Sequence, residues 1–479
     1  MRKYLLPFCL ALTVGLSAQE SYKITIEIEG YDEPVLSLAN NILDKQYIID
    51  TAARTQDGLY VFESDTNALP RGIYLVVLSP DNSYFQMVIG DDDDQVFKLK
   101  TTKEKLSAAK VESSEENKVF YAYLAYLDKQ GEASLPAREA LQDTTLTEAN
   151  RDPLMKELEA ISEKVNAHQQ KVIAQNPKSF TAVIIKANRS NDPPAYEDLA
   201  QEDRNAARLN WLLEHYFDPI DLKDERLLRT PFLFERINYY VDRLHVQHPD
   251  TVAMAIDEVL DKMDPTSEVF KYYVVHFTNK AAKSKFVGMD AVYVHMVDKY
   301  YKGGLAYWTD QEQMLTMIED VERIRPLLIG QQAPNLKMNR RDGSPVELYN
   351  VDARYTILYF WKYDCASCKK STPYMKEFYS KWQDKGVEIF SVCTKQSSVE
   401  KCWEYIDDQE IGEWLHATDR YQRFFKDYDV RSTPSIYVLD ENKKIVSKRI
   451  GAQQLDELLQ QLEKQRELQE RSDKPTGKR

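Results

Sequence analysis

Apolar runs and amphipathic runs alternate along the chain from Thr356 to Leu468, and this alternation constrains the fold more than any other feature of the sequence. The apolar runs are short and rich in β-branched and aromatic residues, as strands are, whereas the runs between them repeat apolar residues at helical spacing. The pattern predicts strands at 356–361, 387–393, 435–439 and 444–450, and helices at 365–385, 399–409, 421–428 and 455–468. Such alternation builds a mixed α/β sheet with helices on both faces.

Two cysteines at Cys-x-x-Cys spacing, Cys365 and Cys368, follow the first of these strands across a loop of three residues, 362–364. This position predicts that Cys365 lies at the N-terminus of a helix, where unpaired N–H groups and the helix dipole stabilise a thiolate. Cys368 lies one turn further, where its thiol can attack a mixed disulfide that Cys365 has formed. The pair is therefore expected to be catalytic, with Cys365 as the nucleophile.

A Cys-x-x-Cys pair alone also fits half of a zinc site or a purely structural pair. A zinc site would need a second pair at similar spacing, but Cys393 and Cys402 are nine residues apart. Thr433 and Pro434, just before a predicted strand, favour disulfide exchange, because a cis-proline loop there would face the dithiol. The backbone of Thr433 is expected to pair with the substrate's chain.

Three further residues of this region have two interpretations each. Cys393 and Cys402 are either an auxiliary disulfide or redox thiols, or they are two small buried side chains, and the sequence favours the second because free cysteine often packs in cores. Trp361 is expected to form a wall of the substrate-binding site, part of the core, or both.

The rest of the chain predicts a multidomain protein. An N-terminal antiparallel β-sandwich is expected at 20–102, where apolar residues alternate between turn signals, and an all-α domain at 103–325. The C-terminal α/β domain should occupy 328–469, followed by a charged tail at 470–479.

The first 18 residues have the features of a secretory signal peptide: a positively charged start, an apolar stretch and a small-residue cleavage point. Cys9 is interpreted as part of this leader, so the four remaining cysteines all lie in the C-terminal domain. No later segment is long and apolar enough to predict a transmembrane helix. With 63 Lys and Arg against 77 Asp and Glu, the net charge is -14, which disfavours nucleic acid as a partner.

Neither a metal nor another cofactor is expected. His245 and His248 are spaced for a metal pair on a helix, but no third ligand is evident. The acidic run 91–94 lacks the alternating ligands and closing Glu of a calcium loop, so a solvated turn is the expected structure.

Residues from about 330 to 468 resemble the thioredoxin-like domain of the TlpA/ResA type of periplasmic thiol-disulfide oxidoreductase. The motifs that carry this resemblance are Gly330-x-x-Ala333-Pro334, Phe360-Trp361, Cys365-x-x-Cys368, Pro373, Thr433-Pro434 and Asp440-Glu441-Asn442. The layout of the whole chain is similar to multidomain exported thioredoxin-like proteins of Bacteroidetes. The resemblance implies a periplasmic or envelope location, a thiol- or disulfide-containing envelope protein as client, and an unidentified electron donor or acceptor.

Three positions depart from the family. Tyr359 stands where thioredoxins usually have a buried Asp, Ser371 stands where ResA-like proteins usually have a Glu, and Asp364 directly precedes the first cysteine. Reductase, oxidase and isomerase roles all stay open as a result. The alternative function is a non-catalytic envelope binding or scaffold protein with a thioredoxin-like recognition or redox-sensing module. A thiol peroxidase is disfavoured, because the Pro and Thr expected shortly before its cysteine are absent.

Overall fold

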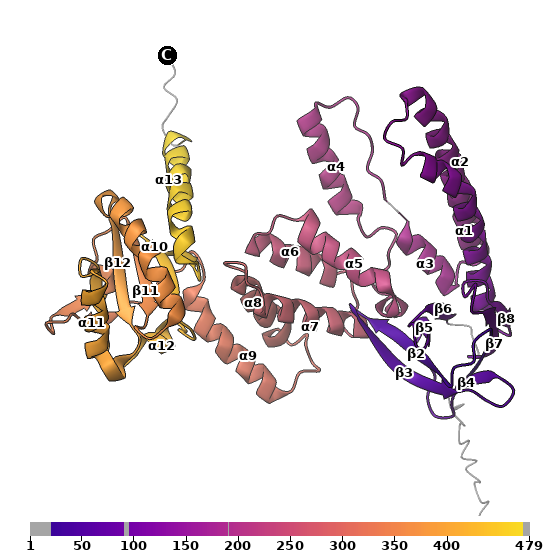
Figure 1. Cartoon of the computed structure of the whole chain (residues 1–479), viewed down its shortest axis with the longest axis horizontal. Helices are drawn as coiled ribbons and strands as arrows, with labels where there is room; N and C mark the ends of the chain where they lie inside the picture. The colour runs from indigo at the N-terminus through magenta and orange to yellow at the C-terminus, as the bar shows by residue number, and fades with distance from the viewer. Residues whose placement is uncertain (1–20, 91–94, 190, 473–479) are drawn as a thin grey trace, which may run out of the picture. The chain divides into compact units, whose positions relative to one another are not determined.

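The computed structural model describes residues 21–90, 95–189 and 191–472, which Figure 1 shows coloured along the chain. The predicted signal peptide, the acidic run 91–94 and the end of the predicted tail lie outside these residues. The chain forms two compact units. One runs to Leu244 and includes Asp261–Tyr272, and the other comprises His245–Leu260 and continues from Tyr273.

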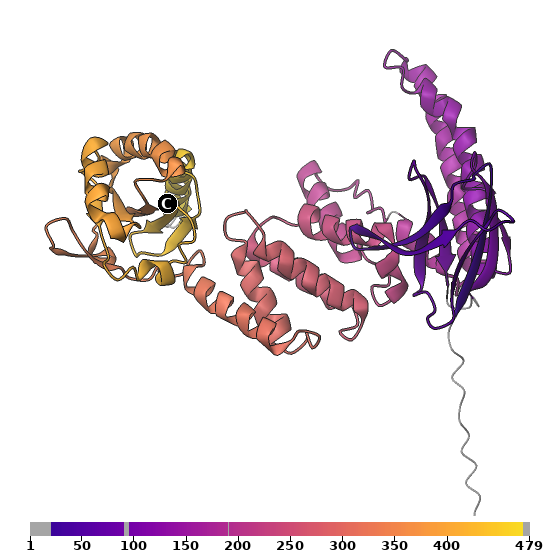
Figure 2. The ribbon, with the colours of Figure 1, turned by 60° about the horizontal axis from the view of Figure 1, so that its bottom comes forward.

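The first unit begins with two four-stranded sheets, whose curved strands are visible beside α1 in Figure 2. One sheet has the order β4-β1-β7-β8 and the other β3-β2-β5-β6. The strands are β1 (Tyr22–Glu29), β2 (Val35–Ile42), β3 (Lys45–Ala53), β4 (Leu59–Ser64), β5 (Gly72–Leu78), β6 (Tyr84–Ile89), β7 (Val96–Thr102) and β8 (Lys110–Glu112). Alternate residues of β1 are buried, as the sequence pattern predicts. One pairing differs from the expected antiparallel arrangement, because β1 and β7 run parallel, with Ile24 opposite Phe97.

Helices follow the sheets, as predicted. They are α1 (Glu115–Ala140), α2 (Glu148–Gln175), α3 (Phe180–Asn188), α4 (Gln201–His215), α5 (Pro231–Tyr239), α6 (Pro249–Leu260), α7 (Glu268–Ala282), α8 (Asp290–Met296) and α9 (Gln311–Ile324). Within the described residues, no helix is both long and apolar enough to cross a membrane.

The C-terminal sheet has five strands in the order β13-β12-β11-β14-β15. They are β11 (Tyr355–Trp361), β12 (Val387–Cys393), β13 (Leu415–Ala417), β14 (Ser435–Asp440) and β15 (Ile445–Lys448). The central strand β11 is buried along its whole length, pairs parallel with β12 and antiparallel with β14, and therefore contributes side chains to two cores.

Different elements cover the two faces of this sheet. Ile357 and Tyr359 pack with residues of α10 (Ala366–Trp382), α11 (Val399–Asp408) and α13 (Leu455–Ser472). Leu358 and Phe360 pack on the opposite side with α12 (Phe424–Asp427) and with the hairpin of β9 (Lys337–Asn339) and β10 (Pro345–Glu347). The multidomain fold class is thus confirmed, and Figure 1 shows its helices around the C-terminal sheet.

Four elements of this part differ from the sequence prediction. The strands β9, β10 and β13 were not expected, because three residues are too few to show an alternation. The expected helix at 421–428 shortens to α12, which has four residues.

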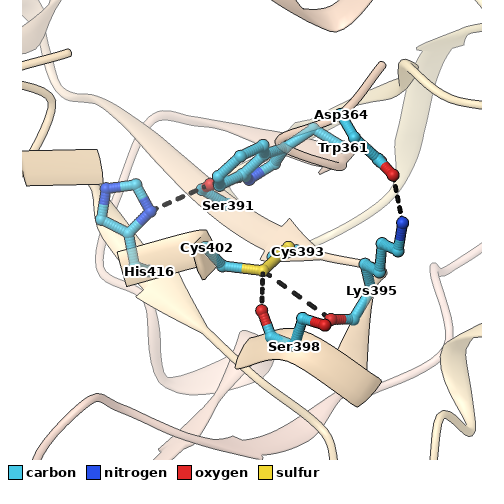
Figure 3. Close-up of a disulfide and its surroundings, with 8 residues drawn as sticks. All are labelled: Trp361, Asp364, Ser391, Cys393, Lys395, Ser398, Cys402 and His416. Carbon is cyan, nitrogen blue, oxygen red and sulfur yellow. Dashed lines mark hydrogen bonds and ion pairs between the residues drawn. A yellow bond between two sulfur atoms is a disulfide. The ribbon is translucent and has the colours of Figure 1, made fainter. Parts of the chain in front are cut away.

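Cys393 and Cys402 are joined by a disulfide, so the expectation that they merely pack as free thiols is wrong. Both side chains are nevertheless buried, at 3% and 1% exposure. Figure 3 shows the bond linking the end of β12 to α11, with the Cys402 sulfur 3.9 Å from the carbonyl oxygen of Lys395. A disulfide sulfur carries no proton, so this approach is a close contact rather than a hydrogen bond.

Reduction of this disulfide is expected to lower the free energy of unfolding by about 2–3 kcal/mol, because a bond across nine residues restricts the unfolded chain. The measurement is urea denaturation of the Cys365→Ser/Cys368→Ser variant with and without reductant, since the active-site pair cannot then contribute. Equal urea midpoints in the two samples would contradict the assignment.

Candidate active site

Cys365 is the N-cap residue of α10, as the sequence predicts. The backbone N–H of Cys368 donates a hydrogen bond to the Cys365 sulfur over 3.2 Å, in the position that an N-cap side chain takes. Cys365 is partly exposed and Cys368 is 1% exposed, and both are free thiols in the structure. The arrangement therefore offers one accessible sulfur and one protected sulfur.

The loop that contains Thr433 and Pro434 faces this pair. The Thr433-Pro434 peptide bond is cis, and the carbonyl oxygen of Thr433 lies 3.3 Å from the Cys365 sulfur. Sheet register explains the approach, because Phe360 near the end of β11 lies opposite Ser435 at the start of β14. The structure thus brings together all four residues that the sequence singled out for the dithiol and its facing loop.

The two thiols differ in acidity. Partial burial by itself would raise the pKa of Cys365, but hydrogen bonds from the side chain and backbone of Cys368 outweigh it, and the pKa is lowered. Burial, followed by the interaction with Cys365, raises the pKa of Cys368 to about 12. Of the two thiols, Cys365 is therefore the one that loses its proton more readily, and Cys368 is the one that keeps it.

Asp364 does not direct an uncompensated charge at Cys365. Figure 3 shows its carboxylate paired with the Lys395 ammonium group, and this hydrogen bond lowers the pKa of Asp364. The Lys395 ammonium also lies 5.3 Å from the centre of the Tyr363 ring. Since Lys395 belongs to the segment that the Cys393–Cys402 disulfide closes, the disulfide holds the partner of Asp364 beside the active site.

Trp361 is 2% exposed, which favours its interpretation as part of the core over direct contact with a client. Its indole Nε1–H donates to the Ser391 hydroxyl over 2.7 Å, and Ser391 Oγ lies 3.1 Å from Nδ1 of His416. His416 Nε2 lies 2.7 Å from the carbonyl oxygen of Ile411, so this nitrogen carries the proton and Nδ1 accepts from Ser391. Burial lowers the pKa of His416 to about 4, which keeps the ring neutral.

This buried network, drawn in part in Figure 3, was not found in the sequence. A serine inside a strand and a lone histidine far along the chain carry no spacing signal that would link them to Trp361.

Tyr359 and Ser371 occupy the two positions at which the family that the sequence resembles usually has a carboxylate. The Tyr359 side chain is 1% exposed, and its hydroxyl has no hydrogen-bond partner in the part of the chain that the structure describes. Burial raises its pKa, so this phenol stays protonated. Ser371 donates its hydroxyl hydrogen to the carbonyl oxygen of Ser367.

His245 and His248 do not belong to a group of three potential metal ligands within the described residues. Among the described residues, no group of three or more His, Cys, Asp or Glu side chains is arranged to hold a metal ion.

Two protein-family models match the chain. The AhpC/TSA family matches residues 329–448, and a domain of unknown function, DUF5106, matches residues 166–324. A thiol-disulfide oxidoreductase named ResA from Bacillus cereus is 29% identical over 136 residues, which are 28% of this chain and 78% of that protein.

Two solved structures are also similar. A domain of a possible thiol-disulfide isomerase from Cytophaga hutchinsonii is 39% identical, with 30% of this chain and 98% of that chain covered and a TM-score of 0.28. A thioredoxin-like protein from Bacteroides caccae is 19% identical, with 57% and 98% covered and a TM-score of 0.43. Together with the fold and the cysteine motif, the family match shows that the C-terminal part of this chain is a thioredoxin-like domain of the AhpC/TSA family.

Proposed function

We propose that this protein is an exported thiol-disulfide oxidoreductase that exchanges disulfides at Cys365 and Cys368. The observation that carries the proposal is the position of the Cys365 sulfur, which accepts a hydrogen bond from Cys368 N–H and lies 3.3 Å from the Thr433 carbonyl oxygen. A sulfur at a helix N-terminus, with a lowered pKa and an exposed edge, is suited to nucleophilic attack. The similarity to ResA supports the same chemistry.

The exchange has two steps. In the first, the Cys365 thiolate attacks a client disulfide, a mixed disulfide forms, and the other client sulfur leaves as a thiolate. In the second, Cys368 loses its proton and attacks the Cys365 sulfur, which releases the second client thiol and leaves the Cys365–Cys368 disulfide. Two electrons pass to the client, so a dithiol donor must restore the enzyme. The same steps in reverse oxidise a client dithiol.

The client is an envelope protein with accessible thiols or a disulfide, and Thr433 and Pro434 form the surface beside which its cysteine binds. Export depends on residues 1–18, whose charged start and apolar stretch match a signal peptide. The domain boundaries at 20–102, 103–325 and 328–469 also stay predictions.

Replacement of either cysteine should have a distinct effect. Cys365→Ser removes the nucleophile, and the rate of disulfide reduction is expected to fall by about 10³-fold or more. Cys368→Ser is expected to retain attack but to accumulate a mixed disulfide, visible on a non-reducing gel. Ser367→Ala, in the same helical turn, is the control and should react as the wild type does. Full reduction of a disulfide peptide by Cys365→Ser would show that Cys365 is not the nucleophile, whereas no reduction by the wild type would favour a binding module instead.

The acidity of Cys365 predicts a specific pH dependence. Because only the thiolate is alkylated and its pKa is lowered, the rate of reaction with iodoacetamide should begin to fall at a lower pH than for a free cysteine. Tandem mass spectrometry of the reduced wild-type chain follows alkylation of Cys365 separately from that of Cys368, so both hydrogen bonds from Cys368 stay in place. A midpoint at or above that of free cysteine would contradict the assignment.

The pairing of Asp364 with Lys395 predicts a second shift of that midpoint. Lys395→Ala leaves the Asp364 charge next to the nucleophile without its partner, and the pKa of Cys365 should rise. Asp364→Asn in the same background should bring the midpoint back, because the uncompensated charge is then gone. A midpoint that Lys395→Ala leaves unchanged would show that the ion pair has no influence on the thiol.

A further inference from the structure

A cavity of about 780 Å³ adjoins the cis-proline loop, and neither of the two cysteines lines it. Ser432, Pro434 and Ser435 form one part of its wall. The facing wall comes from the segment between α7 and α8 and from the helices α8 and α9, all within the second compact unit. Elements outside the thioredoxin-like domain therefore enclose a space that begins at the loop facing the nucleophile.

The rim of this cavity exposes apolar side chains. Phe286 is 79% exposed and Val287 is 44% exposed. Their segment is ordered by hydrogen bonds, because the Ser284 hydroxyl accepts from Phe286 N–H at 3.2 Å and the Phe286 carbonyl accepts from Met289 N–H at 3.3 Å. A fixed turn that holds an aromatic ring in solvent beside a cavity is typical of a binding surface.

The charges of the cavity favour an acidic ligand. Its carboxylates already have partners: Asp290 pairs with the buried Lys448 at 2.5 Å, Asp429 pairs with Arg431 at 3.0 Å, and Asp320 pairs with Arg323. Two cations that line the cavity, Lys285 and Arg449, make no ion pair with any carboxylate that the structure describes. The cavity therefore offers positive charge that a ligand's carboxylates would complement.

We propose that this cavity binds the extended segment of a client that flanks its reactive cysteine, and that this segment carries a large apolar side chain and one or more carboxylates. The inference rests on the proposed function and adds the class of client sequence. Pro434 lines the cavity, and the carbonyl oxygen of the preceding residue, Thr433, lies 3.3 Å from the Cys365 sulfur, so the cavity begins one residue from the atom that contacts the nucleophile. An extended chain advances about 3.3 Å per residue, so residues a few positions from the client's cysteine reach the cavity.

The test compares two disulfide peptides of equal length on the full chain. In one, two residues a few positions from the cysteine are Leu and Asp, and in the other the same two positions are Gly and Ser. The wild type should reduce the Leu/Asp peptide with a kcat/KM about tenfold higher than the Gly/Ser peptide. Phe286→Ala, and separately Lys285→Glu/Arg449→Glu, should each reduce that preference to about twofold or less.

Two control variants replace an exposed aromatic residue and an exposed lysine that lie elsewhere in the chain. Tyr84 is 53% exposed on β6, and Lys464 is exposed on α13, and neither lines the cavity. Tyr84→Ala and Lys464→Glu should keep the tenfold preference of the wild type.

The possible outcomes distinguish failure of the cavity proposal from failure of the proposed function. Equal kcat/KM for both peptides in the wild type, or a preference that both cavity variants retain, would overturn the cavity proposal while the proposed function stands. Failure of the wild type to reduce even a small aromatic disulfide would overturn the proposed function.

A binding measurement tests the cavity proposal even if the wild type reduces no disulfide. The Leu/Asp peptide with Ser in place of its cysteine should bind the Cys365→Ser/Cys368→Ser chain, and Phe286→Ala should weaken that binding. Absence of binding, or displacement of the peptide by a second copy of the chain as protein concentration rises, would overturn the assignment of the cavity to a client segment.

Discussion

The candidate site depends on backbone pairing between β11 and β14. Phe360 lies opposite Ser435, so the loop that precedes β14 ends where the loop after β11 begins. The first loop delivers the Thr433 carbonyl and the second delivers Cys365, and their 3.3 Å approach follows from strand register rather than from any contact between side chains. Burial of β11 on both faces fixes that register, because a slip of one residue would exchange the two cores.

The surroundings of the two cysteines then give their thiols different acidities. Cys365 accepts an N–H hydrogen bond and has a lowered pKa, whereas burial raises the pKa of Cys368. Tyr359 and Ser371 stand at the two positions where the family that the sequence resembles usually has a carboxylate. Beside the more exposed Cys365, the Asp364 carboxylate pairs with Lys395. The Cys393–Cys402 disulfide joins β12 to α11 around that lysine, so it links domain stability to the charge environment of the nucleophile.

The dithiol and its facing proline could be predicted because each is a local signal: a motif after an apolar strand, and a Thr-Pro before another. The disulfide could not, because Cys393 and Cys402 are joined by the packing of α11 on the sheet, which a spacing of nine residues does not reveal. The network of Trp361, Ser391 and His416 and the cavity near Phe286 likewise join residues far apart in the chain. The parallel pairing of β1 with β7 could not be predicted either, because these two strands are also far apart in the chain.

The most direct test of the account is a redox titration of the full chain in thiol and disulfide buffers, with the state of each cysteine read by differential alkylation and mass spectrometry. The account predicts one two-electron transition in which Cys365 and Cys368 pass together between dithiol and disulfide. If these two cysteines show no such transition at any potential of the titration, or if each pairs with a different cysteine of the chain, the assignment of the active site is wrong.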